Sequence, residues 1–155
     1  MTGVVLIIVL TGVSGCLGSK TPPVSRPSAP AVLVDYHRTG GIAGFDDRLV
    51  MFDNGVVVVS GKTVNQEIEI NKTDIDRIVT LFNQSQFSLL EGNYSARPGS
   101  TDLIKYTISY NSKTVNAEDS AIPPELQPVI DELNRILTLT TGMKQTSGLA
   151  ADMLR

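Results

Sequence analysis

The chain contains a single cysteine, a single histidine and no tryptophan among its 155 residues. A single cysteine cannot form a disulfide within the chain, so a folded domain of this sequence must be stable without one. One histidine, His37, is too few for a self-contained zinc site built on histidine ligands. We therefore expect no metal site and no cofactor in this chain.

Positive charge is not in excess either, because the net charge is −3. Domains that bind nucleic acid usually carry a basic patch, so nucleic acid is not an expected partner. No nucleophile motif accompanies His37, and Asp46 and Asp47 are interpreted as solvated charges. The sequence therefore predicts that the chain is not an enzyme. The competing hypothesis is a hydrolase that uses His37 with Asp35 or Asp47.

A long apolar run occurs at the N-terminus, where residues 4–10 read Val-Val-Leu-Ile-Ile-Val-Leu. The run is shorter than the roughly 20 residues of a membrane-spanning helix, and it fits the apolar region of a secretory signal peptide. The small residues that precede Cys16 resemble a lipobox, the processing site of prokaryotic lipoproteins. That resemblance implies cleavage before Cys16 and attachment of lipid to its thiol. We expect the protein to be anchored in the cell membrane through Cys16, with its domain outside the cytoplasm.

Four regions follow from composition. Residues 1–15 are predicted to be the signal peptide, and residues 16–30, rich in proline and serine, a lipidated tether. Prolines fix the backbone and donate no hydrogen bond to a sheet, so this segment cannot build a core. Residues 31–140 are predicted to form one folded domain, and residues 141–155 a mobile tail. We expect this domain to be a monomer.

The first half of the domain has the pattern of a hairpin followed by a helix. Strands are predicted over residues 31–38, 46–52 and 56–60, with a short extended piece within residues 64–70. Asn54 and Gly55 lie between the second and third strands, and this pair favours a tight turn in which both residues have positive φ. A helix is predicted to begin near Thr73, capped by Asn71 or Thr73, because apolar residues then recur at helical spacing.

The second half has the pattern of two strands followed by a helix. Residues 104–110 alternate strictly between apolar and polar side chains, which is typical of a strand covered on one face. A short strand is predicted over residues 113–117, and a helix over residues 128–139 that Gly142 ends. The order is β-β-β-α-β-β-α. We therefore predict an α+β fold, with an antiparallel sheet of about five strands and two helices packed on one face.

The stretch from Arg38 to Phe45 contains three glycines in eight residues and lies between two predicted strands. Its spacing does not fit a dinucleotide-binding loop, and no Lys-Ser or Lys-Thr pair follows, as a phosphate-binding loop requires. Two interpretations stay open. The glycines form a corner between antiparallel strands, or they form a loop whose backbone approaches a partner closely.

Three motifs give the domain a resemblance to the emfourin family, protein inhibitors of thermolysin-like metallopeptidases. The first is Arg-Thr-Gly-Gly-Ile-Ala-Gly at residues 38–44, which is similar to the family's Arg-Ser-Gly-Gly-Phe-Ala-Gly. The second is Thr101-Asp102 before the alternating strand, and the third is the entry to the last helix. That entry contains two prolines, Leu126, Ile130 and Leu133. The resemblance covers residues 32–137 and implies an α+β fold that occludes the active site of a zinc peptidase. Any zinc would belong to that enzyme.

The sequence and the resemblance together predict a surface lipoprotein that binds an extracytoplasmic thermolysin-like metallopeptidase. The residues expected to contact the partner lie in the glycine-rich stretch: Arg38, Gly40, Gly41, Ile42, Gly44 and Phe45. The alternative is a structural or adhesive surface lipoprotein with no protease partner, because a shared fold does not fix function.

Overall fold

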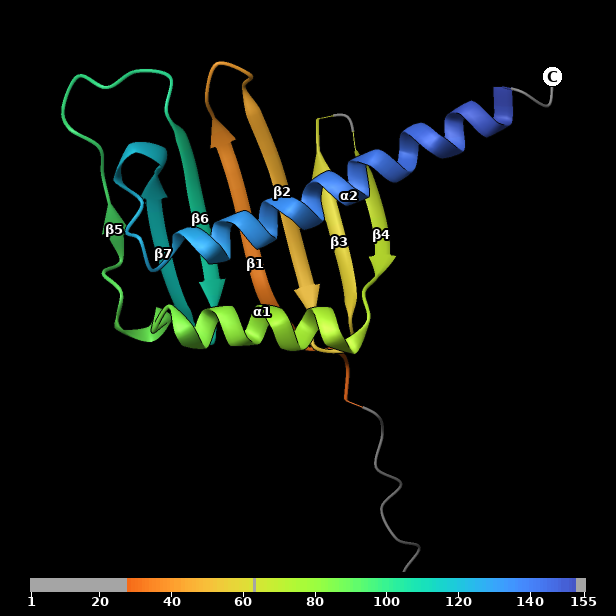
Figure 1. Cartoon of the computed structure of the whole chain (residues 1–155), viewed down its shortest axis with the longest axis horizontal. Coiled ribbons are helices and arrows are strands. Elements are labelled where there is room, and N and C mark those ends of the chain that lie inside the picture. Colours follow the sequence, from red (N-terminus) through yellow and green to blue (C-terminus); the bar gives the residue numbers. More distant parts are fainter. Residues whose placement is uncertain (1–27, 63, 153–155) are drawn as a thin grey trace, which may run out of the picture.

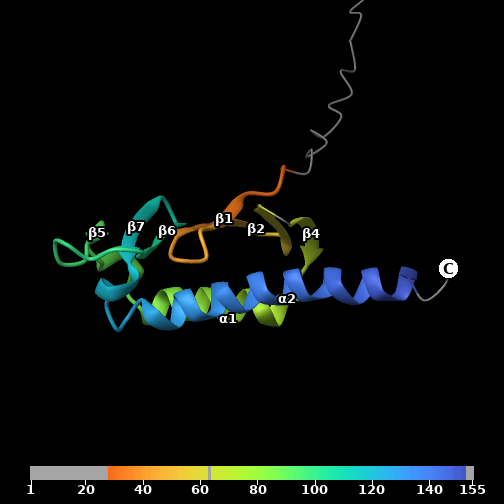
Figure 2. The same ribbon diagram turned by 90° about the horizontal axis from the view of Figure 1, so that it is seen from above.

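The computed structural model describes residues 28–62 and 64–152, with side chains through residue 140. These residues form one seven-stranded sheet in the spatial order β4-β3-β2-β1-β6-β7-β5, with two α-helices (Figure 1). Seen from above, both helices lie on the same side of the sheet (Figure 2). No helix of residues 28–62 or 64–152 lies on the other face of the sheet. The fold is therefore α+β, as predicted.

The strands are β1 (Val32–Gly40), β2 (Phe45–Phe52), β3 (Val56–Gly61), β4 (Asn65–Glu69), β5 (Asn93–Tyr94), β6 (Ile104–Tyr110) and β7 (Lys113–Glu118). The helices are α1 (Lys72–Gln84) and α2 (Gln127–Asp152), with short 3-10 turns η1 (Phe87–Leu89) and η2 (Asp119–Ala121). All neighbouring strands are antiparallel except β5, which pairs parallel to β7.

The prediction of about five antiparallel strands was wrong, because the sheet has seven strands and is mixed. The strand β4 has only one apolar residue, Ile68, so its apolar periodicity is weak. The strand β5 has two residues and therefore no periodicity at all. It is held in place because Gly92 O accepts a hydrogen bond from Asn116 N at 3.0 Å. Both extra strands lie at the edges of the sheet.

The core lies between the sheet and the two helices. Alternate residues of the central strands point into it, and Tyr36, Leu49 and Ile108 are fully buried there. The helices contribute apolar stripes that include Phe82 from α1 and Ile130 from α2. Because successive strand side chains point to opposite faces, the intervening residues lie on the helix-free face.

The turn between β2 and β3 differs from the predicted pattern. Between β2 and β3, Gly55 N donates to Phe52 O at 3.1 Å, and Gly55 alone has positive φ, at +89°. The prediction of positive φ at Asn54 was therefore wrong, and the turn belongs to the three-residue class with a glycine at its end. Two consecutive residues with positive φ occur instead at Asn111 and Ser112, between β6 and β7.

The helix ends show one correct and one incorrect prediction. Asn71 caps α1, because its side-chain oxygen accepts a hydrogen bond from Asp74 N at 2.9 Å. The predicted end of the last helix at Leu139 was wrong, since α2 continues through Gly142 to Asp152. One glycine costs a helix only about 1 kcal/mol relative to alanine, so it need not end the helix.

Among the described residues, the helices include none that is long and apolar enough to cross a membrane. The predicted signal peptide, Cys16 and most of the predicted tether lie outside the described residues.

Candidate functional site

The glycine-rich loop, residues 41–44, connects β1 to β2 at the end of the sheet opposite to α1 (Figure 1). Gly44 N donates to Gly41 O at 2.9 Å, which closes the turn. Gly41 N donates to Leu103 O at 3.0 Å, which fixes the loop to the segment that precedes β6. The side chain of Lys62 adds a hydrogen bond to Gly44 O. The loop backbone is thus held from both sides.

The glycines at the start of this loop are required by the fold. Gly40 has φ +86°, and a Cβ added to it would lie 2.6 Å from Leu103 O. Gly41 has φ +70°, and its added Cβ would lie 2.8 Å from Ile104 Cγ1. Side-chain-bearing residues rarely adopt positive φ, and at distances below 3.0 Å a neighbouring atom would have to shift to admit a Cβ. These observations favour the interpretation of Gly40 and Gly41 as a corner between strands.

Ile42 projects from this fixed loop into solvent. Its side chain is 93% exposed, the highest value among the large apolar residues that the structure describes. The next highest values belong to Leu89 at 77% and Val32 at 56%. A single exposed apolar side chain is ordinary on a protein surface, but Ile42 lies on a backbone whose conformation is already determined. It is the predicted contact residue that the structure leaves most available.

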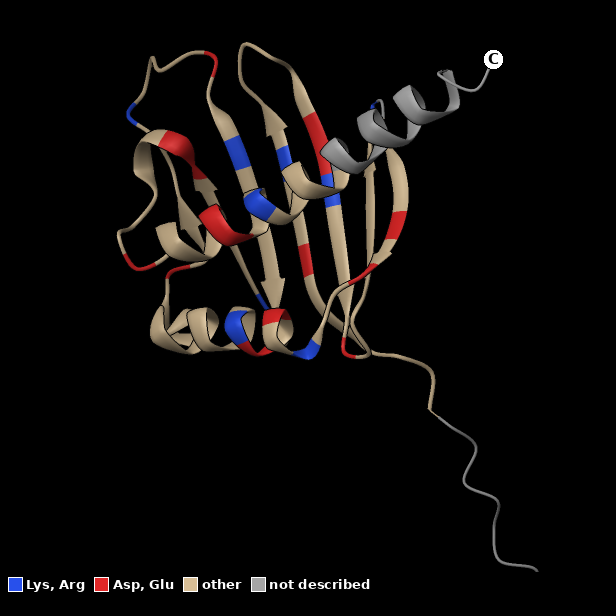
Figure 3. Ribbon diagram, turned by 45° about the vertical axis from the view of Figure 1, so that its right-hand side comes forward, with Lys and Arg blue, Asp and Glu red and all other residues tan. Residues whose placement is uncertain are grey.

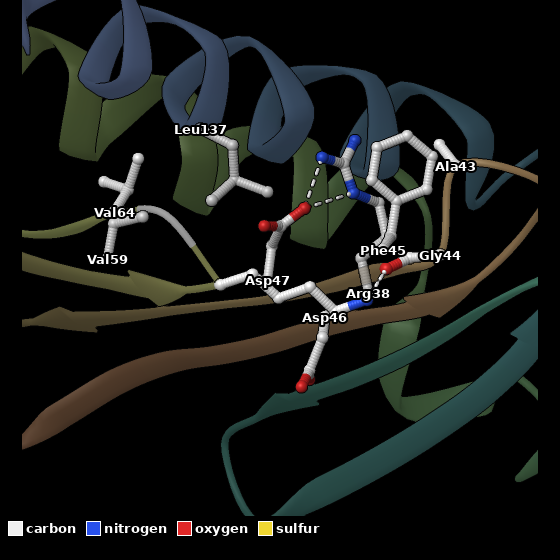
Figure 4. Close-up of a pocket in the computed structure, with 10 residues that line it drawn as sticks. Arg38, Ala43, Gly44, Phe45, Asp46, Asp47, Val59, Val64 and Leu137 are labelled. Carbon is white, nitrogen blue, oxygen red and sulfur yellow. Dashed lines mark hydrogen bonds and ion pairs between the residues drawn. The ribbon is translucent and has the colours of Figure 1, made fainter.

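Arg38 and Phe45 form the base of the loop and lie on the helix side of the sheet (Figure 4). The guanidinium of Arg38 donates to Asp47 Oδ2 from Nε at 3.2 Å and from Nη2 at 2.7 Å. It donates from Nη1 to Asn134 Oδ1 of α2 at 3.0 Å. Its Cζ lies 4.0 Å from the centre of the Phe45 ring, within the range of a cation–π contact. Arg38 therefore joins β1, β2 and α2.

Tyr36 completes this network from the adjacent layer of the core. Its hydroxyl donates to the same Asn134 Oδ1 at 2.9 Å. Burial raises the pKa of the Tyr36 phenol far above its ordinary value, so this hydroxyl keeps its proton. One amide oxygen of α2 thus receives hydrogen bonds from two side chains of β1. Sequence patterns did not identify Asn134, because it lies 96 residues from Arg38 in the chain.

A pocket of about 310 Å³ lies beside the base of the loop. Its wall includes Phe45, Asp47, Val59, Val64 and Leu137 (Figure 4). The two cations at its rim, Arg38 and Lys62, already donate to partners within the chain. No three acidic, histidine or cysteine side chains in the described part of the chain are placed to hold a metal ion. The pocket therefore offers a partly apolar recess beside the loop.

The residues of the competing hydrolase hypothesis do not come together as it requires. His37 Nε2 lies 3.0 Å from Asp46 Oδ1 on the helix-free face. Asp35 accepts two hydrogen bonds from Arg48, at 2.9 and 2.6 Å. Asp47 is paired with Arg38 on the opposite face. Neither Asp35 nor Asp47 is therefore the partner of His37.

Comparison with known proteins identified no relative of this chain. No family model matches the chain, and neither a curated protein nor a solved structure matches it. The chemistry of the loop therefore rests on the residues themselves.

Proposed function

We propose that this protein is a surface lipoprotein whose domain binds a partner protein through Ile42 and the loop that presents it. The observation that carries the proposal is the combination of a nearly fully exposed isoleucine with a loop backbone fixed by hydrogen bonds. The proposed partner class is an extracytoplasmic thermolysin-like metallopeptidase, which comes from the resemblance of residues 38–44 to the emfourin motif. Lipid on Cys16 would hold the domain at the membrane.

The fixed loop suits binding because it is already ordered in the folded domain, so binding does not include the conformational entropy cost of ordering it. Burial of an isoleucine side chain contributes about 1.5–3 kcal/mol. This contribution is large enough for one residue to dominate a small interface. A mobile loop with the same side chain would lose part of that energy on becoming ordered.

The predicted contact residues take different roles in this proposal. Ile42 makes the apolar contact with the partner. Gly40 and Gly41 give the backbone its path, and Gly44 offers a carbonyl that Lys62 already engages. Arg38 and Phe45 support the loop from beneath, because their contacts are within the chain. We propose no catalytic residue and no enzymatic activity.

The test is titration of purified thermolysin-like metallopeptidases with the full-length protein in mild detergent, followed by a peptide-cleavage assay. We expect inhibition that Ile42→Asp weakens by about 1.5–3 kcal/mol in binding free energy, because the burial of one apolar side chain is lost. Leu89→Asp is the matched control, since Leu89 is also exposed and lies in η1 after α1. It should leave inhibition unchanged.

If a micromolar excess of the protein inhibits none of several such peptidases, the result would favour the alternative, a structural or adhesive surface module. Equal weakening by Ile42→Asp and Leu89→Asp would contradict the role of the loop. The metallopeptidase class and the loop are thus tested by separate results.

A further inference from the structure

The strand β4 forms a free edge of the sheet. It pairs only with β3, and the strand order among the described residues ends there. The opposite edge is β5, which has two residues, whereas β4 has five. A free edge presents backbone N–H and C=O groups that can pair with another extended chain. The longer edge, β4, is the one that offers room for a ladder.

The two faces of β4 carry different chemistry. Glu67 and Glu69 are exposed on the helix-free face, and they lie opposite Val58 and Val56 of β3. No salt bridge within the described residues includes either carboxylate. Acidic residues colour this edge in Figure 3. In the described part of the chain, the helix-free side of this edge therefore presents two carboxylates that form no salt bridge.

The helix side of the same edge carries Ile68 and Gln66, which lie opposite the buried Val57 and Val59 of β3. Ile68 lies there, half-buried, beside a recess of about 160 Å³ whose wall includes Ile70, Ile136 and Leu139. Leu139 of α2 is 47% exposed at this recess. The helix α2 crosses β4 and continues past it in both views (Figures 1 and 2). A strand added beside β4 would therefore be crossed by the part of α2 that continues past β4, close to Leu139.

We propose that the β4 edge binds an extended segment of a partner protein in which basic and apolar side chains alternate. Backbone hydrogen bonds to β4 contribute the part of the affinity that does not depend on the sequence of the segment. Its alternate side chains contribute the selectivity. The basic side chains face Glu67 and Glu69, and the apolar side chains face Ile68 and Leu139. This surface is separate from the Ile42 loop, and its proposal does not depend on that loop's function.

A second copy of this chain is a poor occupant of the edge. If two β4 strands paired antiparallel, with the axis at Glu67 or Ile68, a glutamate of one copy would face a glutamate of the other. Like charges placed directly opposite across two strands are destabilising. The same two residues thus disfavour self-association and favour a basic strand.

The test uses the full-length protein and a synthetic peptide that alternates lysine and valine. Calorimetry should show binding, and hydrogen exchange should show new protection of the amides of β4. The double variant Glu67→Lys with Glu69→Lys should reverse the selectivity, by about tenfold or more for each peptide. The double variant should no longer bind the lysine peptide, and it should bind a peptide that alternates glutamate and valine. The matched control is Glu91→Lys with Glu125→Lys, which changes the net charge equally at exposed positions elsewhere.

A second peptide separates strand pairing from simple attraction between charges. Methylation of alternate backbone nitrogens removes donors and leaves every charge in place, so it should abolish binding. Equal binding of the methylated peptide would overturn the proposal, as would equal effects of the two double variants. A dimer of the unmodified protein that is lost in the Glu67→Lys, Glu69→Lys variant would also overturn it, by identifying a second copy as the occupant.

Discussion

Gly41 shows at the scale of one residue how the fold constrains the loop. A side chain there meets two separate costs, the positive φ of +70° and the contact with Ile104 Cγ1 at 2.8 Å. Gly99 has φ +92° but nothing within 4 Å of its added Cβ, and Gly92 also has open space. Substitutions at these three glycines can therefore distinguish the cost of backbone strain from the cost of a steric clash, because Gly41 has both, Gly99 has only the first and Gly92 has neither.

Gly41→Val should destabilise the domain by at least about 2 kcal/mol, because left-handed φ costs roughly 1–2 kcal/mol and overpacking adds more. Urea denaturation of the purified protein measures the change. Gly99→Val should reduce the stability only by the backbone cost of its positive φ. Gly92→Val should reduce the stability less than Gly41→Val or Gly99→Val does. If Gly41→Val unfolds at the same urea concentration as the unmodified protein, the loop is more adaptable than its geometry indicates. For this reason Ile42→Asp is the better probe of binding.

Asn134 is the residue on which the base of the loop converges. Asn134→Leu leaves the Tyr36 hydroxyl and one Arg38 nitrogen without their acceptor. An unsatisfied buried polar group costs about 1–3 kcal/mol, so we expect a loss of stability of that size in thermal unfolding. Thr138→Leu is a suitable control, since Thr138 is exposed one turn along α2 and its hydroxyl donates to Asn134 O, the backbone carbonyl of the same residue. Equal losses from the two variants would argue against this role of Asn134.

At the scale of elements, α1 and α2 are joined by a network of four charged residues. Arg135 donates to both carboxylate oxygens of Glu132, at 2.9 and 2.7 Å. Arg77 lies 3.7 Å from Glu132 Oε1, and Arg135 lies 3.7 Å from Asp74 Oδ1. The hydrogen bonds from Arg135 hold the pKa of Glu132 below its ordinary value of 4.5, and burial opposes this effect. The network thus favours the ionised form of Glu132.

A lowered pKa in the folded state gives a defined pH dependence of stability. The contribution of Glu132 is fully present above its unfolded pKa, near 4.5, and is lost as pH falls through the lower folded pKa. Denaturation of Glu132→Gln should therefore show a smaller loss of stability below about pH 4.5 than the unmodified protein shows. The effect should be modest because the arginines are half-exposed. Identical acid profiles for the two proteins would contradict the assignment.

The elements also show where sequence patterns succeed and where they fail. The strict alternation of residues 104–110 predicted β6 with its observed bounds, because one face is buried and the other is not. The short extended piece predicted within residues 64–70 is the edge strand β4, whereas β5 was not predicted, since a strand of two residues carries no periodicity. The loop was located from its glycines, but the role of Arg38 was not. Its partners Asp47 and Asn134 are brought together only by the folded sheet and helix.

At the scale of the whole molecule, the point where the described chain enters the domain and the proposed binding loop lie at opposite ends of β1. The described chain enters the domain at the end of the sheet near α1, and the loop lies at the far end (Figure 1). If lipid is attached at Cys16, the domain is held through the end remote from Ile42. The loop then faces away from the attachment point and stays open to a partner.

Lipidation of Cys16 is directly testable on protein isolated from membranes. Mass spectrometry should find an N-terminal Cys16 carrying acyl groups, and Cys16→Ser should release the domain from the membrane fraction. Two acyl chains hold a protein firmly, whereas one is marginal. An intact Met1 or an unmodified Cys16 in the membrane-bound protein would contradict the predicted anchor. The folded domain should be unaffected by the substitution.

The position of β1 has a consequence for how the protein bears tension. If lipid is attached at Cys16, a partner held by Ile42 and pulled away from the membrane would stretch the chain between the lipid and the loop. Within the domain that path is β1 alone, nine residues already extended at about 3.3 Å each, close to the limit of a polypeptide. The strand can hardly be extended further, so the force passes along its covalent backbone. The hydrogen-bond ladders to β2 and β6 therefore stay closed. The partner should therefore detach, or the lipid leave the bilayer, before the domain unfolds.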